Sequence, residues 1–104
     1  MFLFTIKSRV NRRSKTGRKY HDVGGAYVNC YISFRDFEAA KKLAKLLIRD
    51  EGWIPEKVVD AWKIQKRKMR TKRDKQYYAE AIKYGYPLVF HFWPKDAPDA
   101  DLED

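Results

Sequence analysis

The stretch SFRDFEAAKKLAKLLIRDEG, residues 33–52, decides the fold because its apolar residues recur with helical spacing while lysines fill the opposite side. Ser33 stands three residues before Asp36, an arrangement that resembles a capping box, so the helix is predicted to begin there. Gly52 is suited to end it in the left-handed conformation. Five residues form the predicted apolar stripe: Phe37, Ala40, Ala44, Leu47 and Ile48.

The segments before this helix alternate between apolar and polar residues, as strands do. Residues 1–10 and residues 26–33 both follow this pattern, and the second segment is rich in β-branched and aromatic residues. Between them, residues 11–25 are predicted to form a basic loop that ends in a Gly24-Gly25 turn. The two strands are therefore expected to pair as a hairpin with a long basic tip.

Residues 54–65 fit two patterns. With a period of two, Ile54, Val58 and Trp62 share one face and indicate a strand. With a period of 3.6, Val58 and Trp62 also align, and one long helix extends to Tyr84. We favour the strand, because the helical stripe passes through three polar positions and loses its apolar face.

The C-terminal third supplies a second helix and a last strand. Residues 66–75 are a basic run, within which Asp74 is suited to cap a helix that Gly85 ends. Residues 88–93 are bulky and apolar enough for a strand covered on both faces. Residues 95–104 are acidic and are predicted to form a flexible tail.

The predicted order is β-β-α-β-α-β within a single α+β domain, residues 1–94. The simplest architecture is an open-faced two-layer sandwich, with about four mainly antiparallel strands in one sheet and two helices on one face. Tyr27 and Tyr31 then point away from the helices, joined by alternate residues of the last strand: either Leu88, Phe90 and Phe92 or Val89, His91 and Trp93. An exposed aromatic face is typical of a contact site.

Composition limits the class of protein. The chain has 104 residues, a net charge of +9 and a single cysteine, Cys30, which excludes an internal disulfide or a thiolate zinc cluster and suits a reducing cytoplasm. No apolar run is long enough to span a membrane. The first 21 residues are basic and lack acids, but their apolar residues alternate, which argues against an organelle transit peptide. We therefore expect a cytoplasmic protein without a membrane partner.

The positive charge falls in two blocks, at residues 7–19 and 57–75, and both lie largely in predicted loops. Basic loops beside aromatic side chains favour a nucleic acid, RNA or single-stranded DNA, because cations neutralise phosphates and rings stack on unpaired bases. The predicted phosphate contacts are Arg12, Arg13, Lys15, Arg18, Lys19, Lys66, Arg67, Lys68, Arg70, Lys72 and Arg73, and the predicted stacking residues are Tyr27 and Tyr31.

Two alternatives stay open. One is a protein-interaction module that forms a homodimer through the open sheet face and has no nucleic-acid role. A homodimer through this face is also expected beside nucleic-acid binding, if the dimer uses the sheet and the nucleic acid uses the loops. The other is a small ribonuclease using His21 and His91, although nothing in the sequence brings these histidines together. We predict no catalytic residues, no metal site and no cofactor, and Cys30 lies on a predicted buried face, where a cysteine is structural.

Overall fold

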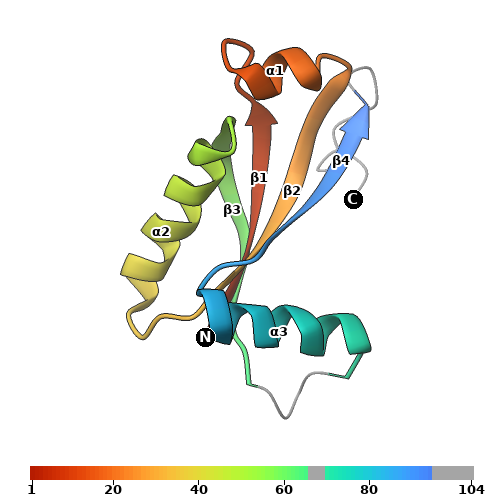
Figure 1. Cartoon of the computed structure of the whole chain (residues 1–104). Coiled ribbons are helices and arrows are strands. Elements are labelled where there is room, and N and C mark those ends of the chain that lie inside the picture. The colour runs from red at the N-terminus through yellow and green to blue at the C-terminus, as the bar shows by residue number, and fades with distance from the viewer. Residues whose placement is uncertain (66–69, 95–104) are drawn as a thin grey trace.

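The computed structural model describes residues 1–65 and 70–94, which contain a four-stranded sheet and three helices (Figure 1). In chain order the elements are β1 (Phe2–Val10), α1 (Lys15–Lys19), β2 (Val23–Ile32), α2 (Phe37–Asp50), β3 (Trp53–Lys63), α3 (Lys72–Tyr84) and β4 (Leu88–Pro94). The strand order is β3-β1-β2-β4, and every neighbouring pair is antiparallel. The predicted α+β sandwich is confirmed, as are the β1–β2 hairpin and the strand, rather than a helix, over most of residues 54–65.

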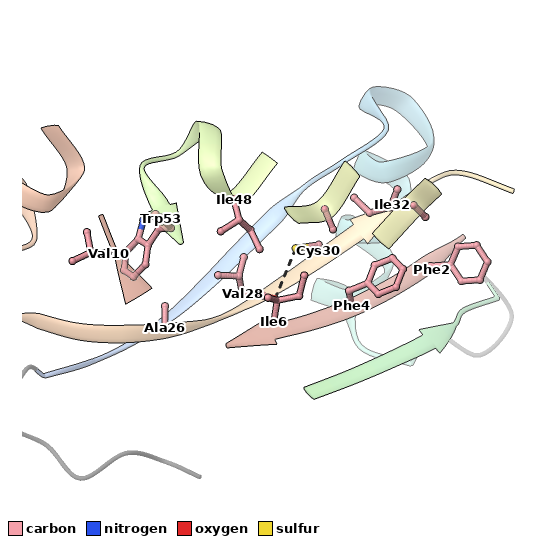
Figure 2. Packing of buried hydrophobic residues seen from close by; sticks show 12 residues of the cluster. Phe2, Phe4, Ile6, Val10, Ala26, Val28, Cys30, Ile32, Ile48 and Trp53 are labelled. Carbon is pink, nitrogen blue, oxygen red and sulfur yellow. Dashed lines mark hydrogen bonds between the residues drawn. The ribbon is translucent and has the colours of Figure 1, made fainter. Parts of the chain in front are cut away.

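The core lies between α2 and the face of the sheet formed mainly by β1 and β2 (Figure 2). Cross-strand neighbours Phe4 and Cys30, and Ile6 and Val28, are fully buried. They meet the small apolar stripe of α2, whose buried members are Ala40, Ala44 and Ile48. Complete burial of a large apolar side chain contributes about 1.5–3 kcal/mol, so this layer is the main source of stability.

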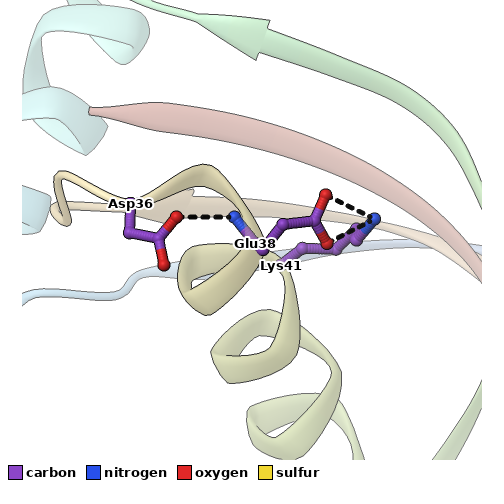
Figure 3. A network of polar contacts seen from close by, with 3 residues as sticks. All are labelled: Asp36, Glu38 and Lys41. Carbon is purple, nitrogen blue, oxygen red and sulfur yellow. Dashed lines mark hydrogen bonds and ion pairs between the residues drawn. The ribbon is translucent and has the colours of Figure 1, made fainter.

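The helix α2 begins later than the sequence predicts. Asp36, not Ser33, is the N-cap, and its carboxylate accepts a hydrogen bond from the Glu38 N–H at 3.3 Å (Figure 3). Glu38 in turn forms an ion pair with Lys41 at 3.1 Å. Ser33 is held elsewhere, because its N–H donates to the carbonyl of Gly85 at 3.1 Å. This backbone bond extends the alignment of β2 with the chain before β4 and delays the start of the helix.

The helix α3, in contrast to α2, begins earlier than the sequence predicts. It also lies apart from α2. Thr71 is its N-cap and accepts from the Asp74 N–H at 2.9 Å, so Lys72 and Arg73 belong to the first turn rather than to a loop. The Tyr77 ring lies 5.3 Å from that of Tyr31, which points to the face opposite α2. Figure 1 shows α3 crossing the end of the sheet near the N-terminus, whereas the sequence placed both helices on one face.

Among the described residues, no helix is both long and apolar enough to pass through a membrane.

Candidate nucleic-acid interface

The segment between β1 and β2 is an ordered turn with its own helix, not the plain basic loop that the sequence predicts. Ser14 is the N-cap of α1, and its hydroxyl accepts from the Gly17 N–H at 3.0 Å. Gly24 and Gly25 lie within β2 rather than in the turn. Five exposed cations lie in or directly before α1: Arg12, Arg13, Lys15, Arg18 and Lys19.

This segment is fastened to the turn between α2 and β3. The Asn11 N–H donates to the Gly52 carbonyl at 2.9 Å, the Ser14 hydroxyl donates to the same carbonyl at 3.3 Å, and the Thr16 hydroxyl donates to the Glu51 carbonyl at 2.7 Å. Gly52 has a φ of 85°, and a Cβ there would lie 2.4 Å from the Thr16 hydroxyl oxygen. Glycine thus permits both the turn and the close approach, and the cations of α1 project from a fixed support.

The five cations are not equivalent. The Arg12 guanidinium donates to the carbonyls of His21 at 3.1 Å and Val23 at 3.2 Å, so it closes the base of the turn. The Lys19 ammonium lies 5.4 Å from the centre of the Tyr20 ring. No carboxylate in the described part of the chain pairs with Arg13, Lys15 or Arg18. The last three are therefore the cations most open to an anionic ligand.

An aromatic cluster adjoins α1. The Phe92 ring lies 5.3 Å from Tyr20 and 5.5 Å from Trp53, both at stacking angles, and Phe90 lies 5.4 Å from Trp53. Trp53 is buried, but Phe92 is 48% exposed. A hollow of about 230 Å³ opens here, lined by Thr16, Lys19, Tyr20, Glu51, Trp53, Phe90 and Phe92. We name the five cations together with Tyr20, Trp53, Phe90 and Phe92 the α1 corner.

The sequence pattern does not predict this aromatic cluster. Its members come from three distant segments and meet only because Val10 pairs with Trp53 and Val23 with Pro94 at the same end of the sheet. One signal was available, the position of Tyr20 beside Lys19 at the end of the basic run. The register of β4 answers the question left open above: Val89, His91 and Trp93 share the face of Tyr27, while Phe90 and Phe92 lie on the side of α2.

The two tyrosines predicted to stack on bases have different surroundings. Tyr31 is only 6% exposed, and its ring lies against that of Tyr77, so little of it is open to a base. Burial, followed by the nearby Asp74 and Tyr77, raises the pKa of Tyr31 above its usual value. Tyr27 is partly exposed and lies 5.3 Å from Trp93, on the face opposite α2.

The described cations around the start of α3 lie at the other end of the sheet from α1 (Figure 1). Arg70, Lys72 and Arg73 are exposed around the start of α3, and Lys66, Arg67 and Lys68 lie outside the described residues. The nine residues of β1 separate this end from α1, a distance of about 30 Å at the usual rise of a strand. The cations around α1 and those around the start of α3 therefore do not share one surface, although Lys7 and Lys57 of the two blocks are cross-strand neighbours midway between them.

The groups considered for catalysis do not converge either. His91 is opposite Tyr27 in the sheet, whereas His21 lies in the turn before β2, and the strand from Val23 to Tyr27, about 13 Å at the usual rise, intervenes. Within the described residues, no group of three or more His, Cys, Asp or Glu side chains could hold a metal ion. Cys30 is a free, buried thiol, and burial raises its pKa to about 12, so it remains protonated at neutral pH.

Three polar side chains on the face opposite α2 contact one another. The Thr5 hydroxyl donates to the side-chain carbonyl of Asn29 at 2.8 Å, and the Asn29 amide lies 3.4 Å from Nε2 of His91. These contacts cross the neighbouring strands β1, β2 and β4, and they occupy hydrogen-bonding groups of Thr5, Asn29 and His91 that a ligand could otherwise bind. Among the described residues, the α1 corner is one of the places where exposed cations and an exposed ring meet, and it is the one where three cations without an ion-pair partner adjoin a ring.

Comparisons of the chain with protein-family models, with curated proteins and with solved structures find no match.

Proposed function

We propose that this protein is a non-enzymatic module that binds single-stranded nucleic acid, RNA or DNA, at the α1 corner. The observation that carries the proposal is the exposed ring of Phe92 beside a docked helix whose cations Arg13, Lys15 and Arg18 have no ion-pair partner among the described residues. Cations held in place bind phosphates with less loss of side-chain entropy than cations on a mobile loop.

The chemistry favours a single strand over a duplex. A base stacks on an aromatic ring only when it is unpaired, and each such contact contributes about 1–3 kcal/mol. Phe92, supported from behind by Trp53, offers one exposed ring for this purpose. Glu51 lines the hollow and repels phosphate, so the backbone is expected to follow Arg13, Lys15 and Arg18 while a base reaches Phe92.

The other predicted contacts have secondary places in this proposal. Tyr27 is partly exposed but lies on the face opposite the α1 corner, and Arg70, Lys72 and Arg73 lie at the far end of the sheet. They would extend a longer strand rather than form the primary site. A reducing cytoplasm remains part of the proposal and is supported by the free cysteine.

Fluorescence anisotropy with a labelled oligo(dT) or oligo(U) tests the proposal across a salt series. For single strands, the slope of log K against log salt is about −0.7 for each phosphate neutralised. The triple variant Arg13→Ala/Lys15→Ala/Arg18→Ala should therefore bind more weakly, with a slope less steep by about 2. The control variant Arg35→Ala/Lys42→Ala/Lys45→Ala removes the same charge elsewhere and should retain most of the slope.

Two results would contradict the proposal. The first is the absence of oligonucleotide binding by the wild-type protein at low salt. The second is an equal loss of slope in both triple variants, because equal losses would indicate a diffuse effect of net charge rather than a site at the α1 corner.

A further inference from the structure

The two edges of the sheet differ in how they are protected from pairing with another strand. β3 carries Glu56, Lys57, Asp60 and Lys63, and its register against β1 shifts twice, at Thr5/Ile6 and at Lys7/Ser8. Charged residues and bulges of this kind are the usual means by which proteins keep an edge strand from associating. The β3 edge is therefore blocked.

The opposite edge, β4, carries no charge, and its one register shift, between Val23 and Gly25, lies at the end of the strand near Pro94. Its sequence LVFHFWP contains no Lys, Arg, Asp or Glu, and its pairing with β2 runs without a shift from Gly25 to Cys30. Pro87 precedes β4 and Pro94 is its last residue, so no proline lies in the middle of the strand. Figure 1 shows β4 at the outer side of the sheet, away from α2. A regular, uncharged and partly apolar edge is a template for strand addition.

The hydrogen-bond pattern identifies which backbone groups of β4 face outward. The Tyr31 N–H donates to the Pro87 carbonyl at 3.1 Å, so these two residues form a hydrogen-bonded pair of the antiparallel ladder. Such pairs recur at every second residue, which directs the backbone groups of Val89 and His91 toward β2. The N–H and carbonyl groups of the residues between them point to the open side: Leu88, Phe90 and Phe92.

We propose that β4 pairs with β4 of a second copy of this chain, antiparallel and about a two-fold axis at Phe90. In this register Leu88 lies opposite Phe92 of the second copy, and all three outward-facing residues find hydrogen-bonding partners. The strand is complementary to itself because it carries no charge that the pairing would bring against a like charge. The proposal does not require nucleic-acid binding, although it places Leu88 of the second copy beside Phe92, the ring of the α1 corner.

An edge-to-edge dimer fits the surface better than packing of two open sheet faces. On the face opposite α2, Lys7 and Lys57 are cross-strand neighbours, and α3 already covers one end near Tyr31. Face-to-face packing would bury these like charges, whereas edge pairing leaves them in water. The product is a continuous eight-stranded sheet with both α2 helices on the same side and the two α1 corners at diagonally opposite ends.

Charge pairing across the two-fold axis tests this register. Val89 lies opposite His91 of the second copy, so Val89→Lys/His91→Lys and Val89→Glu/His91→Glu each place like charges together in two positions. Each variant alone should dissociate at least about tenfold more readily than the wild type in sedimentation equilibrium. An equimolar mixture should recover dimer, because opposite charges then meet. The control pair of double variants, with the same charges at Val59 and Trp62 of β3, should dimerise like the wild type.

Amide hydrogen exchange of the wild-type protein provides a second test that requires no variant. In the dimer, the amides of Phe90 and Phe92 are protected, and their protection increases with protein concentration. A protein that stays monomeric, with rapid exchange at both amides, would overturn the proposal and leave the edge for an extended segment of a different protein. A dimer that survives in both like-charged β4 variants would also overturn it.

Discussion

Replacing Gly17 with alanine tests how tightly α1 is held against the rest of the fold. Helix propensity alone predicts stabilisation, since alanine is favoured over glycine in a helix by about 1 kcal/mol. The structure predicts the opposite. A Cβ at this position would lie 2.2 Å from the Asn11 carbonyl oxygen and 2.7 Å from the Arg12 Cα, both of them backbone atoms that cannot rotate away.

The size of the effect follows from what must move. Ordinary contacts to a Cβ begin near 3.4 Å, so α1 and the Asn11–Arg12 backbone have to separate by about 1 Å. A shift of that size breaks the Asn11–Gly52 and Thr16–Glu51 hydrogen bonds, each worth about 1 kcal/mol. The gain in helix propensity offsets about 1 kcal/mol of this loss, which leaves Gly17→Ala less stable by about 1 kcal/mol.

Urea unfolding followed by tryptophan fluorescence measures this difference. The control is Arg18→Ala, the next residue of the same helix, whose exposed side chain should change stability by less than about 0.5 kcal/mol. Since the cations of α1 depend on the same support, Gly17→Ala should also weaken oligonucleotide binding. A Gly17→Ala variant as stable as the wild type, or more stable, would refute the docked arrangement of α1.

Three further outcomes are expected. Phe92→Leu, which keeps an apolar side chain but removes the ring, should lower the affinity for oligo(dT) by about tenfold in anisotropy titrations while circular dichroism remains unchanged. An unaltered affinity would remove Phe92 from the site. Burial raises the pKa of Cys30 from its ordinary value of 9.0 to about 12. The folded state therefore keeps the proton that the unfolded state releases, and above pH 9 the free energy of unfolding should fall by about 1.4 kcal/mol per pH unit relative to Cys30→Ala. Parallel stability curves for the two proteins would contradict this. Asp36→Ala should destabilise the protein by about 1 kcal/mol, whereas Ser33→Ala should be nearly neutral, and the reverse order in urea unfolding would return the cap to Ser33.

The sheet and α2 could be predicted from the sequence because their signals are local and periodic. Alternation in residues 26–33 correctly directs Val28 and Cys30 to the buried side. The predicted stripe of α2 contains its three buried residues, although Phe37 at its start is 38% exposed. Gly52 and Gly85 both have positive φ where each helix ends. Each of these features depends on neighbours within a few residues, so reading the chain segment by segment was sufficient.

The side of the sheet on which α3 lies could not be predicted, because its apolar face is short. Ala81 is its one fully buried residue, and Ile82 stays exposed. The deciding contacts are the Ser33–Gly85 backbone bond and the packing of Tyr77 on Tyr31, both between residues more than 40 positions apart. The periodicity of α3 does not contain this information. Because α3 packs on this face, Tyr31, which the sequence predicts as a stacking residue, is buried.

The α1 corner shows why the candidate site moved while the fold prediction remained correct. The composition of residues 11–19 correctly indicated a cluster of exposed cations. The position of α1, however, depends on Gly17 and Gly52, because each of these glycines allows another segment to approach closely. A sequence pattern does not contain these approach distances. The same approach brings Tyr20 onto Phe92, so the ring suited to stacking is found at the end of the sheet rather than on its open face. If the rigidity of this support contributes to binding, Gly17→Ala and the triple cation variant should affect oligonucleotide binding differently: one should change the affinity alone and the other also its salt dependence. The glycine variant should weaken binding while the salt slope persists, because the same charges still meet the phosphates, whereas the cation variant should reduce the slope itself.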